Sequence, residues 1–164
     1  MVHYEPFGIY AGTKSAIADL AAGDKIAIPN DGSNRARGLL LLEQEGIITL
    51  KEGVGMEATV LDIESKSVNV EIVEMEAAQI DGVRDSVAMA VINGNYALQA
   101  GLFAGTDGIV AEGSENATVY ANVLVVREGN ENSEKTKALI AALQSDAVKA
   151  YIESTFPGSV VPCF

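Results

Sequence analysis

The stretch KIAIPNDGSNRARGLLLL, residues 25–42, decides the fold class. Its first four residues are mostly apolar, which is typical of a buried strand. The loop that follows, residues 29–34, concentrates turn formers and helix-capping residues. Four consecutive leucines then continue as a helix that ends at Gly46. The stretch therefore predicts one strand, loop and helix unit of an α/β protein.

A second unit of the same kind follows at residues 87–102. Residues 87–92 are almost continuously apolar, which suits a central strand covered on both faces. Asn93 and the two residues after it then open a helix that is expected to run through Leu102. Helices alternate with strands over most of the length, which predicts α/β layering around a largely parallel sheet.

Four further segments have recognisable patterns. Residues 68–73 alternate apolar with polar side chains, and residues 120–127 are rich in valine, so both are expected to be strands. Residues 14–21 are expected to form a short helix. Residues 133–155 place apolar side chains on one stripe and are expected to form a single long helix.

Composition limits the kinds of partner. The 164-residue chain has the size of one globular domain, and 48% hydrophobic residues suffice for a sizeable core. Its net charge of −12 repels phosphate backbones and anionic lipids, so we expect no nucleic-acid partner. No apolar run reaches the roughly 18 residues of a membrane span, and no export signal opens the sequence. The single cysteine, Cys163, allows no intrachain disulfide.

Motifs of catalysis are missing from the sequence. Acyl transfer needs a nucleophile beside a base, yet the chain has one histidine, His3, and no Gly-x-Ser-x-Gly elbow. Gly53-Val54-Gly55 lacks the third glycine of a dinucleotide-binding loop, and there is no phosphate-binding P-loop. The carboxylates are scattered, whereas a metal site needs them clustered. We therefore expect a protein that is not an enzyme and uses no cofactor or metal.

The best candidate for a ligand site is the loop and helix start at residues 30–37. A strand here delivers the chain to a helix N-terminus, where free amide N–H groups and the helix dipole favour an anion. Arg37, one turn inside the helix, is placed to hold a carboxylate bidentately, and Asn34 adds an amide. The alternative is that Asp31 and its polar neighbours only cap the helix and that the arginines are solvent-exposed charges.

Two more asparagines are candidates for the same site. Asn93 follows the predicted strand 87–92, at the carboxyl end where α/β sheets usually place ligands. Asn122 lies near the start of the predicted strand 120–127. Amide groups both donate and accept hydrogen bonds, so they suit a zwitterion. The alternative is that both are ordinary turn or strand residues.

These motifs together resemble the methionine-binding lipoproteins of the MetQ/NlpA type, the receptors of methionine ABC importers. The resemblance runs essentially from end to end. It is carried by HYEPFGIY at residues 3–10, IPND at residues 28–31, NRARGLLLL at residues 34–42, EMEAAQ at residues 74–79, AVINGNYA at residues 90–97, YAN at residues 120–122 and QSD at residues 144–146.

The resemblance implies a fold like that of the type II periplasmic binding proteins, in which two α/β lobes joined by crossover strands enclose an amino acid. Residues 1–12 would form the first crossover strand and residues 13–118 the second lobe. Residues 119–164 would form the return crossover strand and the C-terminal helix of the first lobe. The chain would thus hold one complete lobe plus the C-terminal part of the other, without the signal, lipobox and upstream half-lobe of the family.

The resemblance also implies a function. The family is extracytoplasmic and anchored to the membrane as a lipoprotein, and it captures L-methionine or a similar amino acid for an ABC importer permease. Arg37 would clamp the ligand carboxylate with Asn34 beside it, while Asn93 and Asn122 would orient the α-amino and carboxylate groups. We expect an exposed apolar stripe on the final helix to produce a homodimer. The alternative is a lobe that folds and self-associates without binding a ligand.

Overall fold

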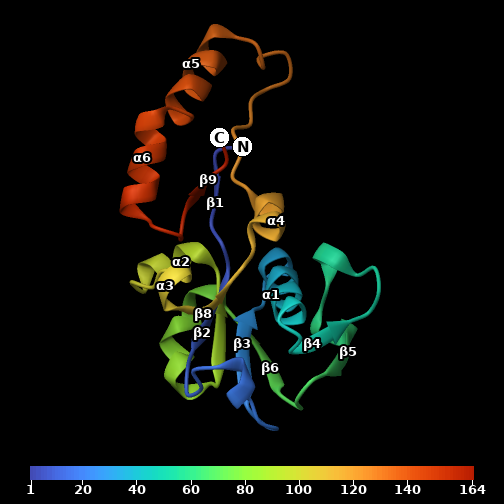
Figure 1. Ribbon diagram of the computed structural model, residues 1–164. Coiled ribbons are helices and arrows are strands. Elements are labelled where there is room, and N and C mark those ends of the chain that lie inside the picture. The colour runs from blue at the N-terminus through green and yellow to red at the C-terminus, as the bar shows by residue number, and fades with distance from the viewer.

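The computed structural model describes residues 1–164, which form a globular body and a projecting arm (Figure 1). The body comprises residues 5–120, and the arm comprises residues 1–4 and 121–164. The strands are β1 (His3–Tyr4), β2 (Gly8–Ala11), β3 (Lys25–Pro29), β4 (Ile48–Leu50), β5 (Ile63–Lys66), β6 (Glu71–Met75), β7 (Met89–Ile92), β8 (Gly108–Ala111) and β9 (Val161–Pro162). The α-helices are α1 (Gly32–Gln44), α2 (Gly94–Gln99), α3 (Ala104–Asp107), α4 (Ser114–Ala117), α5 (Glu134–Leu143) and α6 (Asp146–Thr155).

The body is organised around a five-stranded sheet with the order β6-β3-β7-β2-β8. Strand β3 pairs in parallel with β6 and β7, whereas β2 pairs antiparallel with both β7 and β8. The sheet is therefore mixed, and the prediction of a largely parallel sheet is wrong for the two pairs that β2 forms. The reason is that β2 enters the body from the arm while β8 leads back toward it, so the two run in opposite directions (Figure 1).

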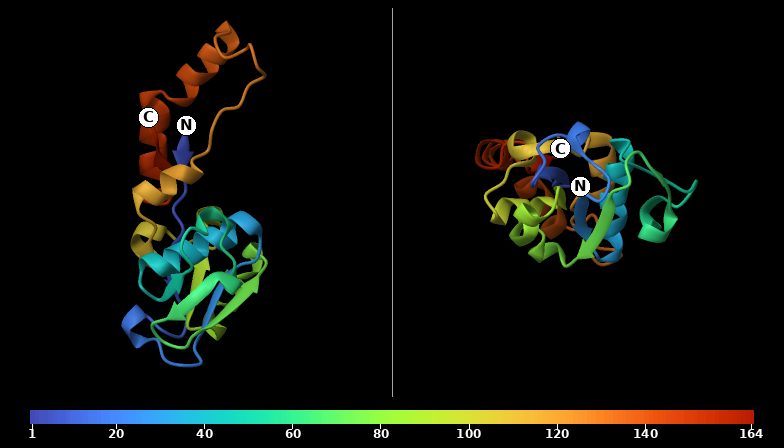
Figure 2. Two further views of the ribbon diagram at one scale, coloured as in Figure 1. Left: turned by 90° about the vertical axis from the view of Figure 1, so that its right-hand side faces the viewer. Right: turned by 90° about the horizontal axis from the view of Figure 1, so that it is seen from below.

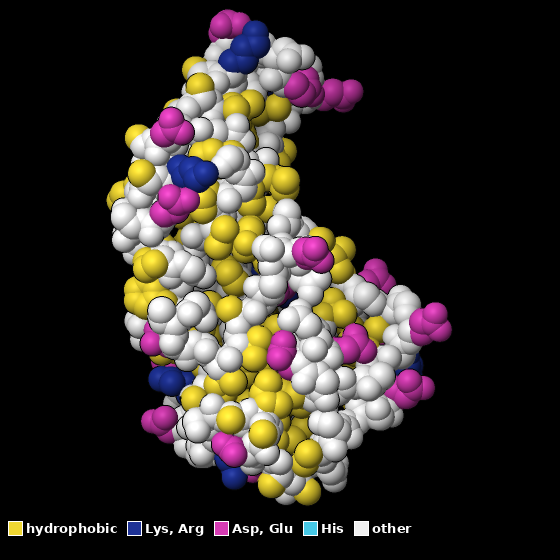
Figure 3. Space-filling view, viewed as in Figure 1, with side chains coloured by type: hydrophobic (Ala, Val, Ile, Leu, Met, Phe, Trp, Pro, Cys, Tyr) yellow, Lys and Arg dark blue, Asp and Glu magenta, His cyan; other side chains and the backbone are white.

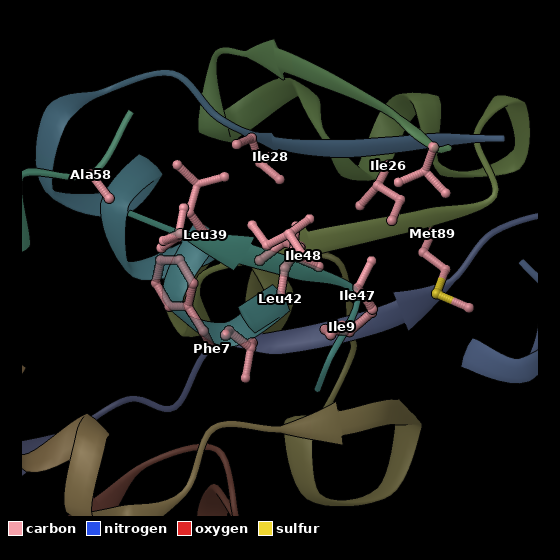
Figure 4. Close-up of a cluster of buried hydrophobic side chains, with 14 of the residues drawn as sticks. Phe7, Ile9, Ile26, Ile28, Leu39, Leu42, Ile47, Ile48, Ala58 and Met89 are labelled. Atoms are coloured by element: carbon pink, nitrogen blue, oxygen red, sulfur yellow. The ribbon is translucent and has the colours of Figure 1, made fainter. Parts of the chain in front are cut away.

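Neighbouring residues of each central strand enter two different cores. On one face Ile9 and Ile26 join a cluster of 17 buried residues that includes three of the four leucines of α1 (Figure 4). On the other face Tyr10 and Ala27 join a second cluster of 8 buried residues. Successive side chains of a strand point to opposite faces, so a sheet covered on both sides must be apolar at every position. This explains the continuous apolar run that predicted β7.

Both predicted strand, loop and helix units are confirmed. In the first, Asp31 caps α1 by accepting a hydrogen bond from the backbone N–H of Asn34 at 3.2 Å. Gly46 follows the helix with a φ of 68°, in the left-handed region that glycine adopts without strain. In the second, β7 leads directly into α2, which begins at Gly94 and ends at Gln99, shorter than expected.

The arm carries both chain termini (Figure 2). Strand β1 pairs antiparallel with β9, matching His3 with Pro162 and Tyr4 with Val161. The chain runs outward after Asn122 and returns through α5 and α6. None of the helices in the body or the arm has the length and apolar character that crossing a bilayer requires.

The prediction of a strand at residues 120–127 is wrong. Tyr120 ends a short 3-10 helix, and only Asn122 makes a bridge, which pairs it with His3. A strand needs a hydrogen-bonded neighbour, and residues 123–127 have none beside them. Valine content alone therefore predicted an extended backbone but not a sheet partner.

The single helix predicted at residues 133–155 is in fact two helices. Helix α5 ends at Leu143, and Ser145 starts α6 by accepting a hydrogen bond from the N–H of Val148 at 3.3 Å. A serine that caps a new helix competes with continuation of the old one.

Two smaller expectations also change. Residues 14–21 hold only the 3-10 turn Ile17–Asp19 instead of a helix, and no side chain caps it. The strand expected at residues 68–73 is shifted, since β6 spans Glu71–Met75. Its register follows from parallel pairing with β3, in which Ile26 lies opposite Ile72.

Candidate functional site

A polar pocket of about 300 Å³ lies at the junction of body and arm. It is enclosed by the first segment of the chain, the N-terminal turn of α1, the start of α2 and the segment that leaves the body after Tyr120. All four predicted ligand residues line it, namely Asn34, Arg37, Asn93 and Asn122. These residues are spread over 89 positions of sequence, and the fold brings them together because both units end their strands at this edge of the sheet.

Arg37 is buried, with 8% of its surface exposed, so it is not the solvent-exposed charge of the alternative interpretation. Its Nε donates to both carboxylate oxygens of Glu112 at 3.0 Å, and its Nη2 donates to one of them and to the backbone carbonyl of Glu5. The rings of Phe7 and Tyr120 lie over the guanidinium, each with its centroid 4.3 Å from Cζ. A stacked and paired guanidinium is held in one orientation.

The buried partner of Arg37, Glu112, was missed by sequence reasoning. Its side chain is only 4% exposed, and besides Arg37 it accepts a hydrogen bond from the N–H of Phe7 at 3.1 Å. It comes directly after the apolar strand β8, as Asn93 comes directly after β7. A polar residue at the end of a short apolar stretch is the signal that could have identified it. Among 23 acidic residues, nothing marks it further.

The loop before α1 both caps the helix and lines the pocket. Asp31 is the cap, and Asn34 is the pocket residue. The Asn34 amide donates from Nδ2 to Asp31 at 3.1 Å, and Asp31 also caps the helix. The cap therefore fixes the orientation of an amide at the rim of the pocket. Arg35, in contrast, pairs with Glu74 on the outer side at 3.4 Å and does not line the pocket.

Asn93 lines the pocket and has one unsatisfied polar atom. Its residue surface is 7% exposed, and its Nδ2 donates to the side chain of Asn95. Its Oδ1 is buried without any hydrogen-bond partner, although it sits at the N-cap position of α2. Leaving such an acceptor unmet costs about 1–3 kcal/mol, and a ligand N–H group would remove that cost.

Asn122 closes the pocket from the arm side. Its backbone N–H donates to the carbonyl of His3 at 2.7 Å, and its carbonyl accepts from Val2 at 2.8 Å. Its side-chain Nδ2 lies 3.2 Å from Nε2 of His3, which is also 3.4 Å from a carboxylate oxygen of Glu5. His3 is thus a residue of β1 that also contacts two residues of the pocket wall.

The aromatic hydroxyl of Tyr120 in the wall of the pocket stays uncharged near neutral pH. Burial raises the pKa of the Tyr120 hydroxyl, Arg37 acts in the opposite direction, and Glu112 adds to the rise. Tyr120 therefore remains protonated near neutral pH and is able to act as a hydrogen-bond donor. The charged residues that line the pocket are then Arg37 and Glu5, which suits a ligand that carries both signs.

A mixed α/β body, entered and left by adjacent antiparallel strands with a polar pocket at their ends, defines the class of type II periplasmic-binding-protein-like folds. Two solved structures show this class. A lipoprotein from Ruminococcus gnavus superimposes with a TM-score of 0.91 at 54% identity, covering 99% of this chain and 68% of that one. A nutrient-binding protein from Burkholderia cenocepacia bound to methionine superimposes with a TM-score of 0.91 at 41% identity. The match covers 100% of this chain and 68% of that one.

Within that class the chain belongs to the NlpA lipoprotein family, whose model matches residues 1–164. The membrane lipoprotein TpN32 of Treponema pallidum is 45% identical over 160 residues, which is 98% of this chain and 59% of the relative. The D-methionine-binding lipoprotein MetQ of Escherichia coli is 40% identical over 158 residues, 95% and 58% respectively. The resemblance and the fold class expected from the sequence are confirmed. The chain spans less than two thirds of the length of these curated relatives.

Proposed function

We propose that the polar pocket binds L-methionine or a related amino acid and that the chain acts in solute capture, not in catalysis. The observation that carries this proposal is a buried guanidinium at the wall of a pocket that is also lined by four asparagines. A zwitterionic amino acid matches such a pocket because it offers a carboxylate and an ammonium group. The methionine-bound B. cenocepacia structure and the D-methionine-binding MetQ of E. coli support the choice of ligand.

Each predicted residue receives a role in this proposal. Arg37 meets the carboxylate, and Asn34 supports it from the helix N-terminus. The unmet Oδ1 of Asn93 accepts a hydrogen bond from the ammonium group. Asn122, held by His3, completes the pocket from the arm.

The domain assignment follows from the same proposal. Residues 13–118 are the second lobe, residues 1–12 are the first crossover strand, and residues 119–164 are the return crossover and the C-terminal helical part of the first lobe. The location of the pocket at the crossover segments supports this division. The cellular setting that we propose is extracytoplasmic, with a lipoprotein anchor and an ABC importer permease as partner, as the family implies.

The second candidate function is self-association without a ligand, and the arm favours it. Hydrophobic side chains gather along the concave edge of the arm (Figure 3). They line a groove of about 340 Å³ that includes Val2, Leu124, Ile140 and Leu143. We propose that a second copy of the chain covers this surface. Light scattering checks it: Ile140→Glu should produce a monomer, whereas Lys137→Glu on the exposed side of α5 should not.

Calorimetric titration with L-methionine tests the proposed function. We expect saturable binding by the wild-type chain and at least about a tenfold weaker affinity for Arg37→Lys, because lysine lacks the planar fork of arginine. The matched control is Arg35→Lys, two residues away on the same helix and outside the pocket. Folded wild-type protein that gives no binding, or equal affinity of the two variants, would contradict the proposal.

A further inference from the structure

We propose that Glu112 is a positioning residue for ligand binding: it occupies the bidentate edge of Arg37 and leaves a single nitrogen, Nη1, to meet a ligand carboxylate. The inference rests on the proposed function, because it concerns the same pocket. In this proposal, Glu112 causes the site to prefer ligands that carry a carboxylate.

Arg37 and Glu112 form a bidentate ion pair. Guanidinium groups hold carboxylates best through two parallel N–H donors on one edge. In Arg37 this edge is formed by Nε and Nη2, and Glu112 takes both of them. The bidentate clamp that the sequence predicted for the ligand is therefore occupied by a residue of the chain itself. A ligand must use what Glu112 leaves.

Further contacts restrain the rest of the Arg37 guanidinium. The carbonyl of Glu5 accepts from Nη2 at 2.9 Å. The Phe7 and Tyr120 rings, each 4.3 Å from Cζ, must take opposite faces of the guanidinium, since one face has no room for both. Only Nη1 makes no hydrogen bond within the chain. The guanidinium is unable to rotate without breaking several of these contacts, so the direction of Nη1 is fixed.

Glu112 contacts Arg37 from outside the polar pocket. Glu112 lines a separate pocket of about 320 Å³ together with Leu40 and Asn116, and it does not line the polar pocket. Arg37 and Tyr120 line both pockets and so form the wall between them. The internal carboxylate stands behind this wall, where it does not compete with a ligand for space.

The ion pair also sets the net charge at the wall of the pocket. A buried cation without a partner is unfavourable. Both side chains of the pair are almost fully buried, and Glu112 neutralises the charge of Arg37. A neutral pair does not attract every anion to the pocket. It instead favours a ligand that makes a directed hydrogen bond from its carboxylate to Nη1 and places its ammonium near Glu5 and Asn93.

The test is an NMR titration of the wild-type chain and Glu112→Gln with two ligands, L-methionine and methioninamide, whose carboxylate is replaced by a neutral amide. Glutamine retains the size of the side chain but not its charge. We expect the affinity of Glu112→Gln for methionine to fall at least about tenfold, the usual loss for a misplaced charge-assisted hydrogen bond. The affinity for methioninamide should change less than about twofold. The control is Glu115→Gln, an exposed residue of the nearby α4.

A second readout needs no ligand. The Nε–H of Arg37 is shielded by Glu112 and should exchange slowly with water in the wild-type spectrum, and at least about tenfold faster in Glu112→Gln. Equal weakening of both ligands would indicate a general structural role and overturn the inference, as would unchanged methionine affinity or an unchanged Nε–H signal. A wild-type chain that binds no methionine would instead contradict the proposed function, and the Nε–H signal alone would then decide whether Glu112 holds Arg37.

Discussion

The body and the arm bury their apolar side chains to opposite degrees. In the body, the side chains of Ile26, Leu39 and Met89 are fully buried. In the arm, Val125 is 80% exposed and Tyr151 is 61% exposed. Burial of apolar area is the main favourable term in folding, so the body has a core of its own while the arm gains little from its own contacts. The comparison predicts two regions of different stability, with the pocket anchored on the more stable one.

The largest expected effect contrasts a leucine of each region. Leu39→Ala removes a fully buried side chain from α1 and should lower the free energy of unfolding by about 2–5 kcal/mol. Leu139→Ala removes a 43% exposed side chain from α5 and should change it by about 0.5 kcal/mol or less. Urea unfolding followed by circular dichroism measures both. Equal losses would show that the arm shares the core of the body.

The next effect is confined to the body and depends on pH. Burial raises the pKa of Tyr10 from 10.0 to about 12, and Asp107 adds to the rise. The unfolded chain loses this proton near pH 10 while the folded chain retains it, so stability should fall as pH rises from 10 toward 12. Denaturant midpoints on both sides of pH 10 check this. The decrease should be smaller in Tyr10→Phe, and an identical decrease would refute the assignment.

The smallest effect compares two helix caps. Asp31 caps α1 in the body, and Ser145 caps α6 in the arm. Replacing either with alanine should cost about 1 kcal/mol locally. We expect Asp31→Ala to reduce the global free energy of unfolding, whereas Ser145→Ala should accelerate amide exchange in α6 about fivefold and leave the exchange of β3 unchanged. Faster exchange in β3 for Ser145→Ala would mean that the two regions unfold together.

The same division separates what could be predicted from sequence. The units around β3 and β7 were predictable because each element carries its own signals, such as a continuous apolar strand and a capping aspartate before α1. The arm was predicted poorly because residues 123–127 have the composition of a strand but no neighbour to pair with. Ser145 ends one helix by starting another, and the apolar periodicity gave no sign of that break.

The pocket shows a similar limit. Arg37, Asn34 and Asn93 were identified because they follow strand ends, which places them at one edge of the sheet. Glu112 was not, because its pairing with Arg37 joins residues 75 positions apart, and its place after a short apolar stretch was the single local signal. The stacking of Phe7 on Arg37 was missed for the same reason. Long-range charge pairing has to be read from the structure.

The measurement that tests the account most directly is a map of backbone amide shifts on titration with L-methionine. The account predicts saturable shifts at Asn34, Arg37 and Asn93, smaller shifts at Asn122 where the arm meets the pocket, and none in α5 or α6. Shifts confined to α5 and α6, or none in a folded sample, would contradict a methionine pocket built on the body.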